Sequence, residues 1–176
     1  MRDIIDYIDE QLHECFPDAQ AFGICHLIED DNAERYPSTL EENAIKVSPD
    51  DRYEVLFYHR LLDGNPEPDE DLSFGRKKTI VNSQTIRTVV FVRMKEDDLS
   101  LIDDFINALP ETFELDDSPV QYKKLSLVRE VNLIRDSTSI WEDEYSAAYK
   151  DKYEKVWNIY AVEYSIQISK CPVCVT

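Results

Sequence analysis

Apolar residues recur along this chain at two different spacings, one typical of helices and the other typical of strands. Residues 3–16 place apolar side chains at helical spacing and acidic side chains on the other face, and Pro17 follows them. This pattern predicts an amphipathic N-terminal helix that ends before the proline. The same spacing over 99–109, closed by Pro110, predicts a second helix near the middle of the chain.

Alternating apolar and polar residues, or short apolar runs, predict several β-strands in the rest of the chain. The segments with these patterns are 19–28, 52–62, 79–94, 120–135 and 156–169. Residues 33–49 fit either an extended segment or a short strand. Because the strands are long and do not alternate regularly with helices, we predict an α+β fold: an antiparallel or mixed β-sheet with an N-terminal helix and a central helix packed on it.

The length of 176 residues fits a single domain spanning 1–176. Within it we expect an acidic, loop-rich region over about 29–78. Residues 63–71 in particular are predicted to form a loop, because they include five acidic residues, one glycine and two prolines. A flexible tail is predicted over 170–176.

Four aromatic residues follow one another at intervals of four within 137–155: Trp141, Tyr145, Tyr149 and Tyr153. On a helix they would form one ridge. The ridge has two readings, either core packing against the sheet or a protein interface that exposes aromatic anchors. The four residues are the candidate interface of this sequence.

The formal net charge of −18 argues against a nucleic-acid-binding protein, because such a surplus of carboxylates repels phosphate. The basic cluster Arg76, Lys77 and Lys78 is outweighed by the acidic residues around it. With only three glycines, the chain has no glycine-rich loop that could hold phosphate. We therefore predict a protein without enzymatic activity, cofactor or direct nucleic-acid partner.

The chain contains no apolar run of 18 residues, and its first residues are acidic and amphipathic rather than typical of a signal peptide. These observations predict an intracellular protein without a membrane partner. Its four cysteines are then expected to be reduced thiols.

Cys171 and Cys174 have the spacing of a zinc knuckle or a redox motif. A zinc ion would need two more ligands, and the available residues come from the other end of the chain: His13, Cys15, Cys25 and His26. The simpler reading is a tail with two free thiols, so the expected metal is none, with zinc at Cys171 and Cys174 as the alternative.

Three further sets of residues have a simple structural reading. Cys25 and His26 are neighbours on a predicted strand, so their side chains should point to opposite faces as a buried cysteine and a surface histidine. His59 alternates with apolar residues and is expected to be half-buried. Residues 69–71 could attract a hard cation, but their acids are consecutive rather than spaced as in a calcium loop, which favours a solvated loop.

Three parts of the chain together resemble the phage tail terminator family: the amphipathic helix over 4–16, the strand 85–94 followed directly by the helix 99–106, and the closing strand 157–166. The resemblance implies an α+β protomer in a homo-oligomeric, hexameric ring between the tail tube and the head-side connector. It implies tail-tube or connector proteins as partners, and no enzyme activity. It also implies a location in the bacterial cytoplasm during assembly and then in the virion tail.

Two other functions stay open at this point. The charge of −18 suits an acidic module that binds a basic protein, which predicts steeply salt-dependent binding. The C-terminal cysteines suit a small zinc-stabilised domain.

Overall fold

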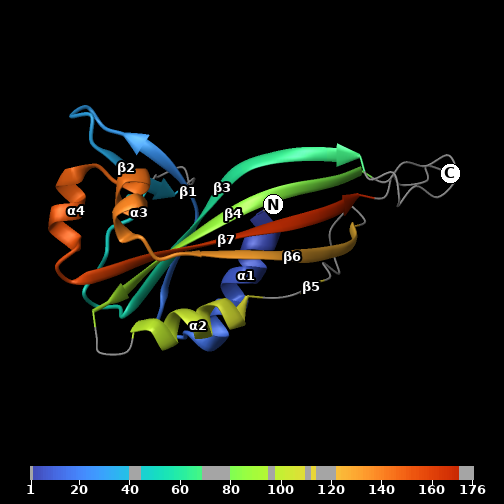
Figure 1. Cartoon of the computed structure of the whole chain (residues 1–176), viewed down its shortest axis with the longest axis horizontal. Helices are drawn as coiled ribbons and strands as arrows, with labels where there is room; N and C mark the ends of the chain where they lie inside the picture. The colour runs from blue at the N-terminus through green and yellow to red at the C-terminus, as the bar shows by residue number, and fades with distance from the viewer. Residues whose placement is uncertain are drawn as a thin grey trace, which may run out of the picture.

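A computed structural model describes residues 2–39, 45–68, 80–94, 98–109, 112–113 and 122–170. These residues form a sheet and four helices, shown in Figure 1. In chain order the elements are α1 (Arg2–Cys15), β1 (Gln20–Glu29), β2 (Arg35–Thr39), β3 (Val55–Pro68), β4 (Ile80–Arg93), α2 (Asp98–Ala108), β5 (Thr112–Phe113), β6 (Tyr122–Ile134), α3 (Ser137–Glu144), α4 (Ala147–Tyr153) and β7 (Trp157–Lys170).

The seven strands form one sheet in the order β2-β1-β3-β4-β7-β6-β5. Strands β1 and β3 pair in parallel, and the other neighbours pair antiparallel. The central pair β4–β7 is in continuous register from Ile80↔Lys170 to Arg93↔Trp157. The predicted α+β class with a mixed sheet is therefore confirmed, together with the packed N-terminal and central helices.

Each face of the sheet is covered by one pair of helices. Helices α1 and α2 bury their apolar sides against β3, β4 and β7, and the ring centroids of Phe16 and Phe105 are 5.8 Å apart between them. Helices α3 and α4 cover the opposite face, where the strands contribute Leu56, Tyr58, Val89 and Phe91. Alternation along each strand supplies both faces with apolar side chains, so the sheet is the middle layer of three.

The predicted loop over 63–71 is wrong in its first part. Strand β3 continues through Pro68 and pairs with β4 from Gly64↔Gln84 to Pro68↔Ile80. Glycine and proline are accepted here because β3 has no other strand beside it at this point among the described residues, so a missing N–H breaks no ladder bond. Residues 69–71 lie outside the described residues.

The ambiguous segment 33–49 contains strand β2 and a short strap over 45–47. The strap is bound to β2 by Thr39 N–H to the Ile45 carbonyl, 2.9 Å, and by Val47 N–H to the Pro37 carbonyl, also 2.9 Å. Val47 is fully buried and anchors the strap in the core. No helix among the described residues is both long and apolar enough to cross a membrane.

Strands β3, β4, β7 and β6 extend beyond the helices on one side of the molecule (Figure 1). We call this extension the arm, and define it by its backbone segments 62–68, 80–84, 167–170 and 122–126. The arm is thus the half of the sheet that no described helix covers, and the other half lies between the two pairs of helices.

Candidate functional site

Three neighbouring strands each carry two consecutive polar residues at the same level of the sheet. These are His59 and Arg60 on β3, Arg87 and Thr88 on β4, and Glu163 and Tyr164 on β7. The register places Arg60 opposite Arg87 and Arg87 opposite Glu163. Because consecutive strand residues point to opposite faces, each pair gives one polar group to each face. We call these six residues the polar belt.

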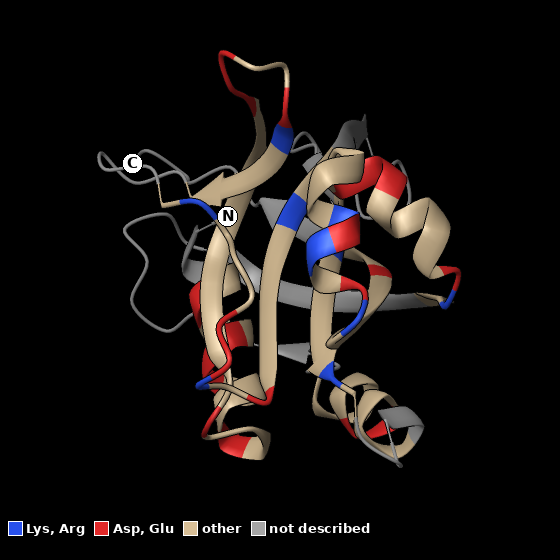
Figure 2. Ribbon diagram, turned by 90° about the vertical axis from the view of Figure 1, so that its left-hand side faces the viewer, with Lys and Arg blue, Asp and Glu red and all other residues tan. Residues whose placement is uncertain are grey.

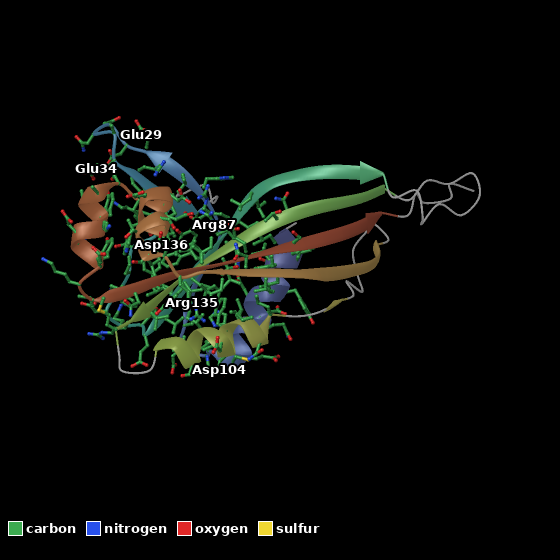
Figure 3. All side chains as sticks on the ribbon, viewed as in Figure 1. Glu29, Glu34, Arg87, Asp104, Arg135 and Asp136 are labelled. Atoms are coloured by element: carbon green, nitrogen blue, oxygen red, sulfur yellow. The ribbon has the colours of Figure 1, made fainter. Side chains whose placement is uncertain are left out.

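On the face of α3 and α4, the belt surrounds the carboxylate of Glu144, which has no solvent exposure. Glu144 accepts hydrogen bonds from the Tyr58 hydroxyl at 3.0 Å, Arg60 at 2.6 Å and Arg87 at 3.3 Å. Arg87 also forms ion pairs with Asp143 at 2.9 Å and Glu163 at 2.7 Å. Figure 3 shows Arg87 between α3 and the sheet.

A buried carboxylate is costly unless charged donors surround it, and two arginines and a phenol do so here. Burial alone would lower the pKa of Arg87, but its hydrogen bonds to Asp143 and Glu163 and the charge of Glu144 raise that pKa above its ordinary value. The guanidinium therefore stays charged. These contacts fix the C-terminal end of α3 on the sheet.

On the opposite face, the belt forms a hydrogen-bonded chain that starts on α1. Asp9 Oδ1 lies 2.8 Å from His59 Nε2, His59 Nδ1 lies 2.7 Å from Thr88 Oγ1, and that oxygen lies 3.0 Å from the Tyr164 hydroxyl. In the His59 tautomer with hydrogen on Nε2, that N–H donates to Asp9. Thr88 then donates its hydroxyl hydrogen to His59 Nδ1, and Tyr164 donates to the Thr88 oxygen. Burial is the main cause that raises the pKa of Tyr164, so its hydroxyl keeps the proton that begins the chain.

The order acid, histidine, hydroxyl is that of a hydrolase triad, which makes Thr88 a formal candidate nucleophile. Thr88 and His59 both have no solvent exposure, and the Thr88 oxygen is already bonded to Tyr164. A substrate carbonyl cannot reach this oxygen. The chain therefore ties α1 to the sheet and has no geometry for acyl transfer.

His59 differs from its prediction, since it is completely buried rather than half-buried. Asp9 from α1 provides the polar partner that makes full burial possible. The prediction for Cys25 and His26 is confirmed, because Cys25 is 2% exposed and His26 is at the surface. Burial, with the nearby charges of Glu144 and Asp9, raises the pKa of Cys25 to about 12, so this thiol is inert.

The four aromatic residues predicted as an interface are all inside the molecule. Trp141, Tyr145, Tyr149 and Tyr153 are 1%, 2%, 8% and 5% exposed. The chain leaves the helix at Tyr145, whose backbone is extended, and starts α4 after Ser146. This break keeps the four rings against one another, with Trp141 and Tyr145 also against Phe91. The core-packing reading is therefore correct, and the interface assignment of these side chains is not supported.

A lysine closes the outer side of this aromatic cluster. Lys46 Nζ, from the strap beside β2, lies 3.8 Å from the centroid of the Tyr149 ring and 4.3 Å from that of Tyr36. The ammonium also donates to the Tyr149 hydroxyl. The cation thus binds the strap to α4 within the same molecule.

A hollow lies between the 48–51 loop and the turn that joins α4 to β7. Its aromatic walls, Tyr153 and Trp157, are only 5% and 2% exposed, and the Tyr153 hydroxyl is held by Ser48 at 2.6 Å. These two rings therefore offer little surface for a ligand to contact.

The other sequence candidates lie outside the described residues: Cys171 and Cys174, the acids of 69–71, and the basic residues of 76–78. Among the residues that are described, no three His, Cys, Asp or Glu side chains come close enough to hold a metal ion. Cys15 is exposed at the end of α1, away from the buried Cys25.

No protein-family model matches this chain, and no curated protein matches it. We therefore infer the function of this protein from the arrangement of its own residues. Sequence patterns missed the polar belt, although part of a signal exists: on β3, His59 and Arg60 are adjacent polar residues inside an otherwise apolar run. Their meaning depends on the register of three strands, which local periodicity does not contain.

Proposed function

We propose that this protein is a non-enzymatic structural subunit that assembles with copies of itself through the arm. The observation that carries the proposal is the length of the paired strands beyond the helices, where β4 and β7 stay in register to Ile80↔Lys170 (Figure 1). A sheet is normally stabilised by a layer packed on it. A neighbouring copy is the simplest partner that could provide this layer in a homo-oligomer.

The two polar clusters of the belt support a structural role. All the belt residues are engaged with partners from the same chain, and both clusters connect a helix to the sheet. A catalytic site needs an acid, base or nucleophile within reach of a substrate. These residues instead fix α1 and α3 to the same three strands, which gives a rigid body suited to assembly.

The form of assembly that we propose is a ring of phage tail terminator type. It would hold six copies and join a tail tube to a head-side connector, first in the bacterial cytoplasm and then in the virion tail. The charge of −18 would suit a channel through which DNA must pass without binding.

The arm can be tested by shortening it at a point that the register defines. Asn65 and Ser83 are directly paired. A variant in which Asn-Gly replaces residues 66–82 should therefore join β3 to β4 through a two-residue hairpin turn. We expect the shortened protein to remain folded and to lose self-association in light scattering coupled to size exclusion. Asn-Gly in place of residues 31–33, at the tip of the β1–β2 hairpin, is the control and should assemble like the unaltered protein.

If both variants and the unaltered protein are monomers at every concentration, and none binds a tail component, the proposal is wrong. If the shortened variant assembles as fully as the control, assembly does not depend on the arm.

One observation favours a second function, binding to a basic protein. The exposed sides of α1 and α2 present Asp6, Glu10, Glu14, Asp103 and Asp104, and Figure 2 marks acidic residues on several helices and turns of the ribbon. This function predicts a monomer that binds its partner with affinity falling steeply as salt rises. Salt-insensitive self-association would instead favour the structural subunit.

A further inference from the structure

We infer that the outer edge of β3 in the arm is closed to strand pairing, so that a second copy cannot extend the sheet there. The inference concerns this edge alone and holds whether or not the chain assembles. If copies do meet at the arm, they must use its faces or another edge.

The edge begins where β1 leaves β3. The parallel pairing of β1 with β3 ends at Ile24↔His59, and β1 then pairs with β2 from Cys25 onward. From Arg60 to Pro68, the described residues place no strand beside β3 on the side away from β4. A free edge of this length normally invites another strand.

Two prolines remove hydrogen-bond donors from this edge. Pro66 and Pro68 are two residues apart, so their nitrogens face the same side of the strand. The ladder with β4 continues through both positions, opposite Asn82 and Ile80. A proline cannot donate to a ladder, so the donors toward β4 are Asn65 and Glu67, and both proline nitrogens face outward.

A β-bulge interrupts the same edge closer to the core. Leu61 pairs with Ile86 and Gly64 with Gln84, so β3 has one more residue than β4 between these pairs. Within the bulge, the Gln84 side-chain amide from β4 donates to the Leu62 carbonyl. A bulge bends and twists a strand, which prevents a straight partner from lying along it.

The other long edges carry comparable features. The strap over 45–47 covers the outer side of β2 through the bridge Ser38↔Lys46. Between the pairs Val128↔Ser165 and Asn132↔Glu163, strand β6 has two more residues than strand β7, so its register with β7 shifts there. Among the described residues, the β3 edge is therefore not the only one with a feature that hinders strand addition.

The test is the double substitution Pro66→Thr with Pro68→Thr, which restores two outward N–H groups in a residue suited to strands. We expect a rise of about two-fold or more in weight-average mass over the unaltered protein, continuing upward with concentration, and new thioflavin T fluorescence. The matched control, Pro17→Thr with Pro49→Thr, removes two prolines outside the strands and should behave like the unaltered protein. Near-UV circular dichroism establishes that the variants are folded.

A second measurement uses the unaltered protein and does not depend on a variant folding. Amide hydrogen exchange should show Asn65 and Glu67 protected by their bonds to β4, and Gly64 exchanging faster because its N–H faces the open edge. Protection of Gly64 equal to that of Asn65 would overturn the inference. A folded Pro66→Thr/Pro68→Thr variant with unchanged mass and no thioflavin T signal would overturn it as well.

Discussion

At the scale of single residues, stability depends on polar groups that are buried together with their partners. Glu144 reaches zero exposure because Tyr58, Arg60 and Arg87 bond to its two oxygens. His59 is likewise fully buried, with hydrogen bonds to Asp9 and Thr88. Such groups contribute little while they are satisfied, and they destabilise strongly when one partner is removed.

Glu144→Gln tests the charged cluster. The substitution leaves two partly buried arginines without their shared anion, and we expect it to lower the free energy of unfolding by about 3 kcal/mol or more. Asp143→Asn is the neighbouring control, because the Asp143 side chain is 55% exposed and its ion pair should contribute about 1 kcal/mol or less. Urea denaturation measures both. Equal losses for the two variants would contradict the central position of Glu144.

Alkaline pH should destabilise the protein. Burial is the main cause that raises the pKa of Cys25 from 9.0 to about 12. Burial is also the main cause that raises the pKa values of Tyr58, Tyr145 and Tyr164 above 10.0. The unfolded chain releases these protons first, so the folded state binds more protons and its stability falls as pH rises above about 9. Cys25 alone should account for about 1 kcal/mol at about pH 10.

Urea midpoints measured between neutral pH and pH values above the unfolded thiol pKa test this expectation. Cys25→Ala should show a shallower fall with pH than the unaltered protein, whereas Cys15→Ala at the surface should match it. A stability that stays constant across this range would show that the buried thiol and phenols do not keep their protons.

At the scale of elements, the apolar periodicity predicted most of the secondary structure. It placed α1, α2, β4 and β7 within one or two residues of their bounds, because each element buries one regular stripe or alternates without interruption. The continuation of β3 through Asp63–Pro68 could not be predicted in this way. Local residue preferences there indicate a turn, and only pairing with β4 holds the segment extended.

The functional residues were harder to predict than the elements. A four-residue spacing identified the aromatic ridge but not its surroundings, since the break at Tyr145 and the strap with Lys46 enclose the rings only in the folded chain. The polar belt requires three strands in register and two helices from distant parts of the sequence. Contacts of that range are tertiary, and no local pattern specifies them.

Two positions with positive φ test how strand β1 and its hairpin are shaped. Gly23 has φ +63° at the register shift between Ala21 and Ile24, and no atom lies within 4 Å of a Cβ added there. Gly23→Ala should therefore cost about 1 kcal/mol through backbone strain alone. Ala33 already has φ 60° at the hairpin tip, so Ala33→Gly should be neutral or slightly stabilising. Thermal unfolding compares the two, and a neutral Gly23→Ala would contradict the strained conformation.

At the scale of the whole molecule, two helical layers are fixed to one half of a long sheet and the other half extends past them (Figure 1). The belt lies near the boundary between these halves, with α1 bound on one face and α3 on the other. The edge of β3 in the arm is closed by two prolines and a bulge. A rigid body with an extended, edge-protected sheet is suited to contact between faces of neighbouring subunits.

Native mass spectrometry of the unaltered protein over a range of concentrations tests the central claim, that this chain is a self-assembling structural subunit. We expect a discrete closed species, near six protomers for a ring of the tail terminator type, that grows at the expense of the monomer as concentration rises. A monomer that persists at every concentration and binds only a basic protein, with affinity lost as salt rises, would contradict it.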